Sequence, residues 1–319
     1  MEAPLQQHLI HLEKGLKSTD TSIVASALFN YSNVVDQHTN NLMLLSNGIL
    51  KLCQTFRDTS DNNVRFLIWR FFDQSRFSVL KSYSFDEICT RLSVVLDSTD
   101  LVGRHYAWKI LYLFSSRLDR QFALFQRIID ILSPDQQTTG LRRKEQRTCM
   151  RIAIQLLRYK FDSFIPFVFN WICGLNVLDE IAIQVIPFIV GDPSISQLLY
   201  EKCKSQSTNC TGEFRVNIFK GMYAHSLHIP HLRKDFFVIC LKELNQFYNY
   251  SDSQINILLL LTANLAHHFP QHKMENELFL DKFLSLHRVI PRLIYFCAKL
   301  RLNLYKKIET SCIIDGSVV

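Results

Sequence analysis

Helical pairs recur along this chain at intervals close to 38 residues, and that recurrence limits the fold more than any other feature. Two helix starts show it clearly, 61-DNNVRFLIWRFF-72 and 98-STDLVGRHYAWKIL-111. Each begins with an acidic or small polar residue suited to cap a helix, passes a Val-Arg or Val-x-Arg, and continues as an apolar stripe. Because one helix hairpin cannot bury such a stripe alone, repeated hairpins predict a stacked solenoid with a continuous core.

The composition favours helices throughout. The 319 residues include 24 Phe but only 9 Gly and 8 Pro, and 48% of them are hydrophobic. Scarce helix breakers and abundant Leu, Ile and Phe predict long helices joined by short turns, and therefore an all-α fold. Breaks at clusters of Gly, Pro, Ser, Asp and Asn define the expected helices. These are 4–17, 20–37, 40–57, 61–75, 84–97, 99–117, 119–132, 140–160, 162–174, 177–190, 194–205, 212–227, 232–248, 252–268, 271–286 and 291–308.

The spacing of the helix pairs indicates the type of repeat. If the helices pair from residue 40 onward, successive pairs begin 32 to 44 residues apart. This scatter suits HEAT or armadillo repeats better than the stricter tetratricopeptide or ankyrin periods. We therefore expect a right-handed α-solenoid that forms one repeat domain over 1–310, with an irregular tail over 311–319. The alternative is an irregular all-α globule in which the spacing arises by chance.

Basic charge is concentrated in two of the expected helices. The chain has a net charge of +7, whereas residues 139–160 alone carry +6 and residues 282–307 carry +7. At ~100° per residue, the arginines of the first segment from Arg143 to Arg158 share ~80° of the helix surface, and the second segment has a similar stripe. The candidate surface residues are Arg142, Arg143, Arg147, Arg151, Arg158, Arg292, Lys299 and Lys306.

These basic stripes suggest a partner with negative charge. Like charges four residues apart repel each other, so the stripes add little to folding. The functional interpretation is that helices 142–160 and 291–308 bind an acidic protein surface or the phosphates of RNA or DNA. The structural interpretation is a solvated face on which long Arg and Lys stems cover the edges of the core.

Sequence motifs for catalysis, cofactors and metals are missing. The chain has no G-x-x-x-x-G-K-[ST], G-x-G-x-x-G, H-E-x-x-H or G-x-S-x-G, so we expect neither an enzyme nor a bound cofactor. One set of residues, Cys203, Cys210, His225, His228 and His231, could supply zinc ligands. Its C-x6-C spacing is wider than that of common zinc sites, so we expect no metal. Nine cysteines without a C-x-x-C motif indicate free thiols in a reducing compartment.

No stretch of the sequence suits a membrane span. The most apolar stretch, 164–191, includes polar and charged residues near its middle, which favours two short buried helices. The N-terminus has no apolar core of signal-peptide length. We therefore expect no contact with a membrane.

Three segments resemble the N-terminal helical repeats of the Integrator complex subunit seven family. They are 12-LEKGLKS-18, 49-ILKLCQTFRDTSDNNVRFLIWRF-71 and 85-FDEICTRLSVVLDSTDLVGRHYAWKILYLFSSRL-118, so the resemblance covers about residues 9–118. It implies a nuclear, non-catalytic α-solenoid that contacts other protein subunits of a large complex. That complex cleaves small nuclear RNA precursors and attenuates transcription by RNA polymerase II.

The resemblance transfers no catalytic residue, because the family has none. Family members are far longer, so we expect a short or truncated form. The alternatives are another HEAT or armadillo adaptor, such as a transport receptor or vesicle coat protein, and a nucleic-acid-binding repeat protein. The expected location is the nucleus, with the cytoplasm as the alternative.

Overall fold

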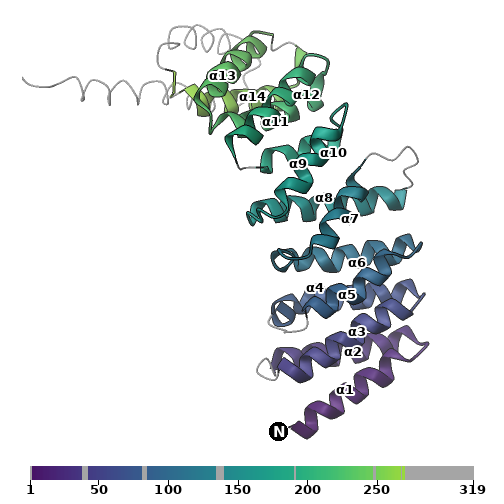
Figure 1. Ribbon diagram of the computed structural model, residues 1–319. Helices are drawn as coiled ribbons and strands as arrows, with labels where there is room; N and C mark the ends of the chain where they lie inside the picture. Colours follow the sequence, from purple (N-terminus) through teal and green to yellow (C-terminus); the bar gives the residue numbers. More distant parts are fainter. Residues whose placement is uncertain are drawn as a thin grey trace, which may run out of the picture. The chain divides into compact units, whose positions relative to one another are not determined.

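The computed structural model describes residues 2–37, 42–80, 85–133, 140–189, 192–246, 249–266 and 268–269. These residues form fourteen α-helices and two short 3₁₀ helices without any strand (Figure 1). The prediction of an all-α fold with paired helices is confirmed. The expected helices 271–286 and 291–308, and the tail 311–319, lie outside the described residues. No described helix is both long enough and apolar enough to cross a membrane.

Contacts between residues group the chain into two compact units, residues 1–171 and 172–319. The single repeat domain expected over 1–310 therefore stays a prediction, and each unit is described by itself. Unit 1 contains α1 (Glu2–Leu16), α2 (Thr21–Gln37), α3 (Leu42–Asp58), α4 (Asn62–Leu80), α5 (Phe85–Leu96), α6 (Leu101–Leu113), η1 (Ser115–Arg117), α7 (Phe122–Leu132), α8 (Gly140–Arg158) and most of α9 (Ile165–Gly174).

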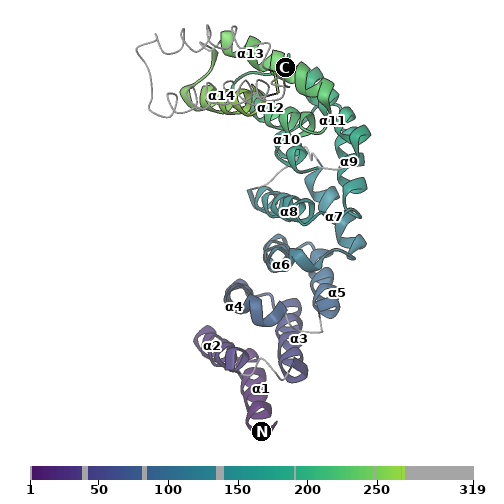
Figure 2. The same ribbon diagram turned by 90° about the vertical axis from the view of Figure 1, so that its left-hand side faces the viewer.

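The helices of unit 1 form two layers. Figure 2 shows α1, α3, α5 and α7 stacked in one layer, and α2, α4, α6 and α8 stacked in the other. Connections of three or four residues, at 17–20, 59–61 and 97–100, fold an odd-numbered helix back onto the even-numbered helix that follows it. The even-numbered helices consequently run parallel to one another.

The core of unit 1 lies between these layers. On α4, Val64, Ile68 and Phe71 are buried, as the apolar stripe predicts, and on α6 Trp108 is completely buried. Phe114 packs edge-on against Phe72 of α4 and Phe85 of α5, with both ring centroids 5.9 Å away. Aromatic packing of this kind adds about 0.5–1.5 kcal/mol per pair beyond the burial of apolar area.

Two arginines with little exposure join α4 to α6 and α6 to α8. Arg65 of α4 donates to the carboxylate of Asp100, which immediately precedes α6. Arg104 of α6 donates to the carboxylate of Glu145 in α8, with an Nη2–Oε1 distance of 2.7 Å. We call these two ion pairs the arginine ladder. The recurring Val-Arg and Val-x-Arg of the sequence therefore supply the donors that connect successive repeats.

Asp100 serves two helices at once, and Gly103 makes room for it to do so. The Oδ1 atom of Asp100 accepts from the backbone N–H groups of Val102 and Gly103, at 3.1 and 3.0 Å, which caps α6. The Oδ2 atom is left to accept from Arg65. A Cβ atom on Gly103 would lie 2.9 Å from Nη1 of Arg65 and 3.0 Å from Oδ2 of Asp100. A larger residue at position 103 would therefore crowd the guanidinium where it crosses α6.

Unit 2 contains, in its described part, α10 (Glu180–Val185), η2 (Ile186–Phe188), α11 (Pro193–Ser207), α12 (Gly212–Ser226), α13 (Pro230–Asn245) and α14 (Asp252–Ala266). The helix expected over 177–190 is shorter, because Pro187 has no N–H to donate and the chain tightens into η2. A similar ion pair occurs in this unit, where the partly buried Arg215 of α12 donates to Glu243 of α13 at 2.6 Å.

A Gly103→Ala substitution tests whether the ladder aligns the even-numbered helices. The added methyl group would force Arg65 and Asp100 apart, and crowding of this kind costs about 1–3 kcal/mol. We expect the free energy of unfolding in urea to fall by that amount. Gly140→Ala is the matched control, since nothing lies within 4 Å of its Cβ position. Equal stability of the two variants would show that the ladder does not need this close approach.

Candidate partner-binding surface

The outward side chains of α2, α4, α6 and α8 form a surface that combines exposed aromatic and basic groups, here named the even-layer surface. On α8, the side chains of Arg143, Arg147 and Arg151 are exposed and lie on one face of the helix. They have no acidic partner within the described residues. Arg158, at the end of α8, is also exposed, whereas Arg292, Lys299 and Lys306 lie outside the described residues.

The single acid of α8 points inward, away from this surface. Only 1% of the Glu145 side chain is exposed. Its Oε1 atom accepts from Nε of Arg104 at 2.9 Å and from Nε1 of Trp108 at 3.1 Å, and its Oε2 atom lies 3.5 Å from Nη1 of Arg142. Arg142 is thus tied to the interior, unlike the three arginines on the outer face of α8. Arg143, Arg147 and Arg151 on the outward face of α8 therefore have no acid beside them in the described part of the chain.

An aromatic cluster continues the surface on α4 and α6. The ring of Trp69 lies 5.7 Å from that of Phe66 and 6.1 Å from that of Tyr106. The Nζ atom of Lys109 lies 3.3 Å from the centre of the Trp69 ring, in a cation–π contact. Burial lowers the pKa of Lys109, and the negative charge of Asp73 opposes that shift.

Trp69 is only partly buried, although it lies in an apolar helical segment. Trp108 and Trp171 are buried. Helical geometry explains the partial exposure of Trp69, because this residue lies ~140° around α4 from Val64, where the buried stripe starts. The apolar character of Trp69 alone would place it in the core, whereas its angle on the helix places it at the edge of the buried stripe.

A groove between α2 and α4 opens onto the same surface. It has a volume of about 470 Å³, and its lining includes Leu28, Phe29, Leu67, Arg70, Phe71 and Gln74. The Phe29 side chain is 68% exposed, which is unusual for a large aromatic residue in the middle of a helix. Leu28 and Phe71 are buried beneath it. The groove therefore exposes apolar surface next to one of the basic residues, Arg70.

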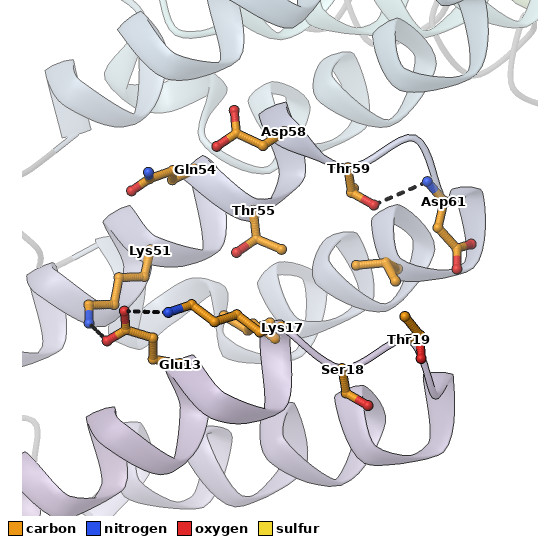
Figure 3. Close-up of a pocket in the computed structure, with 12 residues that line it drawn as sticks. Glu13, Lys17, Ser18, Thr19, Lys51, Gln54, Thr55, Asp58, Thr59 and Asp61 are labelled. Carbon is orange, nitrogen blue, oxygen red and sulfur yellow. Dashed lines mark hydrogen bonds and ion pairs between the residues drawn. The ribbon is translucent and has the colours of Figure 1, made fainter.

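A second pocket, of about 530 Å³, lies at the turns that follow α1 and α3 (Figure 3). Its charged groups pair with one another, since Glu13 accepts from both Lys51 and Lys17. The hydrogen bond and charge of Lys51 lower the pKa of Glu13, and those of Arg57 lower the pKa of Asp58. Both carboxylates are thus ionised at neutral pH, and neither is suited to act as a general acid.

The histidines and cysteines of the candidate zinc set do not converge. His225 is buried, with Nε2 3.1 Å from the carbonyl oxygen of Ile186 and Nδ1 3.3 Å from Oγ of Ser196. Burial lowers the pKa of His225 to about 4, so its ring is neutral at pH 7 and both nitrogens are engaged. His231 contacts Gln197 instead. Within the described ranges, no three His, Cys, Asp or Glu side chains are arranged to hold a metal ion.

Comparison with solved structures identifies the type of repeat. A crystal structure of importin beta, a HEAT-repeat solenoid, aligns with 96% of this chain at a TM-score of 0.52 and 10% sequence identity. The fold is a HEAT-type α-solenoid. The alignment spans only 43% of that importin beta chain. An engineered protein from a structural genomics consortium aligns with 93% of this chain and 87% of its own, at a TM-score of 0.46 and 12% identity.

Sequence comparisons are negative. No protein-family profile and no curated protein sequence matches this chain. At 10% identity, the likeness to importin beta shows the HEAT-type fold alone.

A Glu145→Gln substitution tests whether the inward acid holds α8 to α6. The neutral amide cannot balance the charges of Arg104 and Arg142, and removal of one partner from a buried ion pair costs about 3–5 kcal/mol. Because both arginines keep some contact with water, we expect a loss near the lower end of that range in urea unfolding. Glu201→Gln, at an exposed position in α11, is the control and should change stability by less than about 0.5 kcal/mol. A similarly small effect at Glu145 would contradict its structural role.

Proposed function

We propose that this chain is a non-catalytic scaffold subunit of a nuclear, Integrator-like complex that processes the 3′ ends of small nuclear RNAs and regulates transcription. The observation that carries the proposal is the even-layer surface, which exposes aromatic and basic groups on a HEAT-type solenoid. Aromatic residues and arginine are enriched where proteins bind one another. Other protein subunits of a large complex are therefore the expected partners.

The family resemblance supports the proposal from a separate direction. It covers about residues 9–118, which form α1 to α6 and η1, together with the first rung of the arginine ladder. The resemblance and the candidate surface consequently lie in the same unit of the chain.

The polar groups of the pocket beside Glu13 also favour a scaffold over an enzyme. Catalytic acids and bases have pKa values shifted toward neutrality by burial or by like charge. The pKa values of Glu13 and Asp58 are shifted away from neutrality, since neighbouring cations lower both of them.

A second candidate function is binding of RNA or DNA by the arginines of α8. Arg143, Arg147 and Arg151 are exposed on one face without an acid beside them, as phosphate-binding groups are. The remaining alternative is another HEAT-type adaptor, in a transport receptor or a vesicle coat, with a cytoplasmic location.

Affinity purification of the tagged full chain from separated nuclear and cytoplasmic extracts tests the proposal. We expect Integrator subunits to remain bound in the nuclear fraction after nuclease digestion, because the contacts are between proteins. An unrelated helical-repeat protein with the same tag is the control. Recovery of coat or transport proteins in place of Integrator subunits would contradict the proposal. Loss of all partners after digestion would favour nucleic acid as the ligand.

A further inference from the structure

We propose that the even-layer surface of unit 1 binds an acidic peptide segment of a partner protein, with an apolar side chain of that segment seated in the α2–α4 groove. The inference rests on the proposed scaffold function, because it specifies the chemistry of the segment that the scaffold would hold.

The exposed charges of this surface are almost all positive. The outward basic groups are Arg70, Lys109, Arg143, Lys144, Arg147 and Arg151. Among the side chains described on α2, α4, α6 and α8, Asp73 is the one exposed carboxylate. Uncompensated positive charge of this kind attracts a partner with Asp and Glu side chains and disfavours basic ones. The complementary segment is therefore acidic.

The groove supplies the other half of the recognition. Its floor, formed by Leu28 and Phe71, is apolar and already excludes water, whereas Phe29 stands exposed at its side. Covering Phe29 with a large apolar side chain would remove apolar surface from water, which favours binding. Arg70 is the charged residue described on this groove, so an acidic residue next to the apolar anchor would pair with it.

Parallel packing places these features at one level of the layer. Phe29, Arg70 and Lys109 are each the ninth residue of their helix, counted from Thr21, Asn62 and Leu101. Packed helices lie about 8–10 Å apart, so the outer face of α8 is about 20–25 Å from the α2–α4 groove. An extended chain covers about 3.3 Å per residue. The acidic residues should therefore begin about seven positions from the apolar anchor.

The same surface is less suited to single-stranded nucleic acid. Stacked bases need open aromatic faces, but Lys109 already covers one face of Trp69, with Nζ 3.3 Å from the ring centre. In addition, the groove side of α2 contributes Ala25, Leu28 and Phe29 and no cation for a phosphate. A peptide would fill the apolar groove as well as contact α8, whereas a nucleic acid at the groove would have Arg70 as its one described cation.

A random sixteen-residue peptide library displayed on phage and selected on the full chain tests this inference. We expect the enriched peptides to combine a Leu, Phe or Trp with an acidic cluster about seven positions away. Synthetic copies should bind about tenfold more weakly to Phe29→Ser, and likewise to the double variant Arg147→Glu and Arg151→Glu, as expected for interface residues that contribute strongly. Raised salt should weaken binding to the wild type.

The controls carry the same chemical changes outside the even-layer surface. Phe122→Ser alters an exposed aromatic residue of α7, and Arg120→Glu reverses a charge that is 91% exposed beside α7. Both should bind the peptides as the wild type does, and circular dichroism should show that all variants are folded. Enrichment of neutral or basic peptides, or equal binding by wild type and both groove and α8 variants, would overturn the proposal.

A twenty-nucleotide RNA provides the competing ligand. Arginine-dependent RNA binding, in the absence of any enriched peptide, would assign α8 to nucleic acid and overturn the peptide site. The outcome is separable from that of the scaffold proposal. If Integrator subunits co-purify equally with the wild type and the α8 double variant, the scaffold proposal stands and the proposed peptide site is contradicted. If peptides bind in a groove-dependent way but Integrator subunits do not co-purify, the peptide site stands and the scaffold proposal is contradicted.

Discussion

Two ion pairs, one between α4 and the start of α6 and one between α6 and α8, hold these helices of unit 1 in register. Asp100 caps its own helix and accepts from Arg65 of the helix before it, while Glu145 accepts from Arg104, Trp108 and Arg142. Apolar stripes alone would tolerate sliding of one helix along another. A buried charge left without its partner would cost several kcal/mol, so the ladder allows one alignment.

The ladder also determines what the surface can bind. Because Glu145 is used internally, α8 presents Arg143, Arg147 and Arg151 without an acid between them. The helices that carry these arginines, the aromatic cluster around Trp69 and the α2–α4 groove are stacked in one layer (Figure 2). The same interaction therefore links the stability of the repeats to the polarity of the candidate site.

Much of the fold could be predicted from the sequence, because helix starts and apolar stripes are local signals. The pairs around Asp61 and Asp100, and the long helix of α8, lie where their caps and periods place them. The partners of the ladder arginines could not be predicted, since Asp100 lies 35 residues from Arg65 and Glu145 lies 41 residues from Arg104. The exposed groove beside Phe29 likewise depends on how two helices separate in space. The roles of Arg292, Lys299 and Lys306 stay predictions.

The most direct test of the account is lysine footprinting of the full chain, alone and purified with its bound partners. Lys144 is exposed on the even-layer surface, and Lys17 is exposed at the turn after α1. We expect partner binding to slow acetylation of Lys144 severalfold and to leave acetylation of Lys17 unchanged. Protection of Lys17 with full reactivity at Lys144 would contradict it.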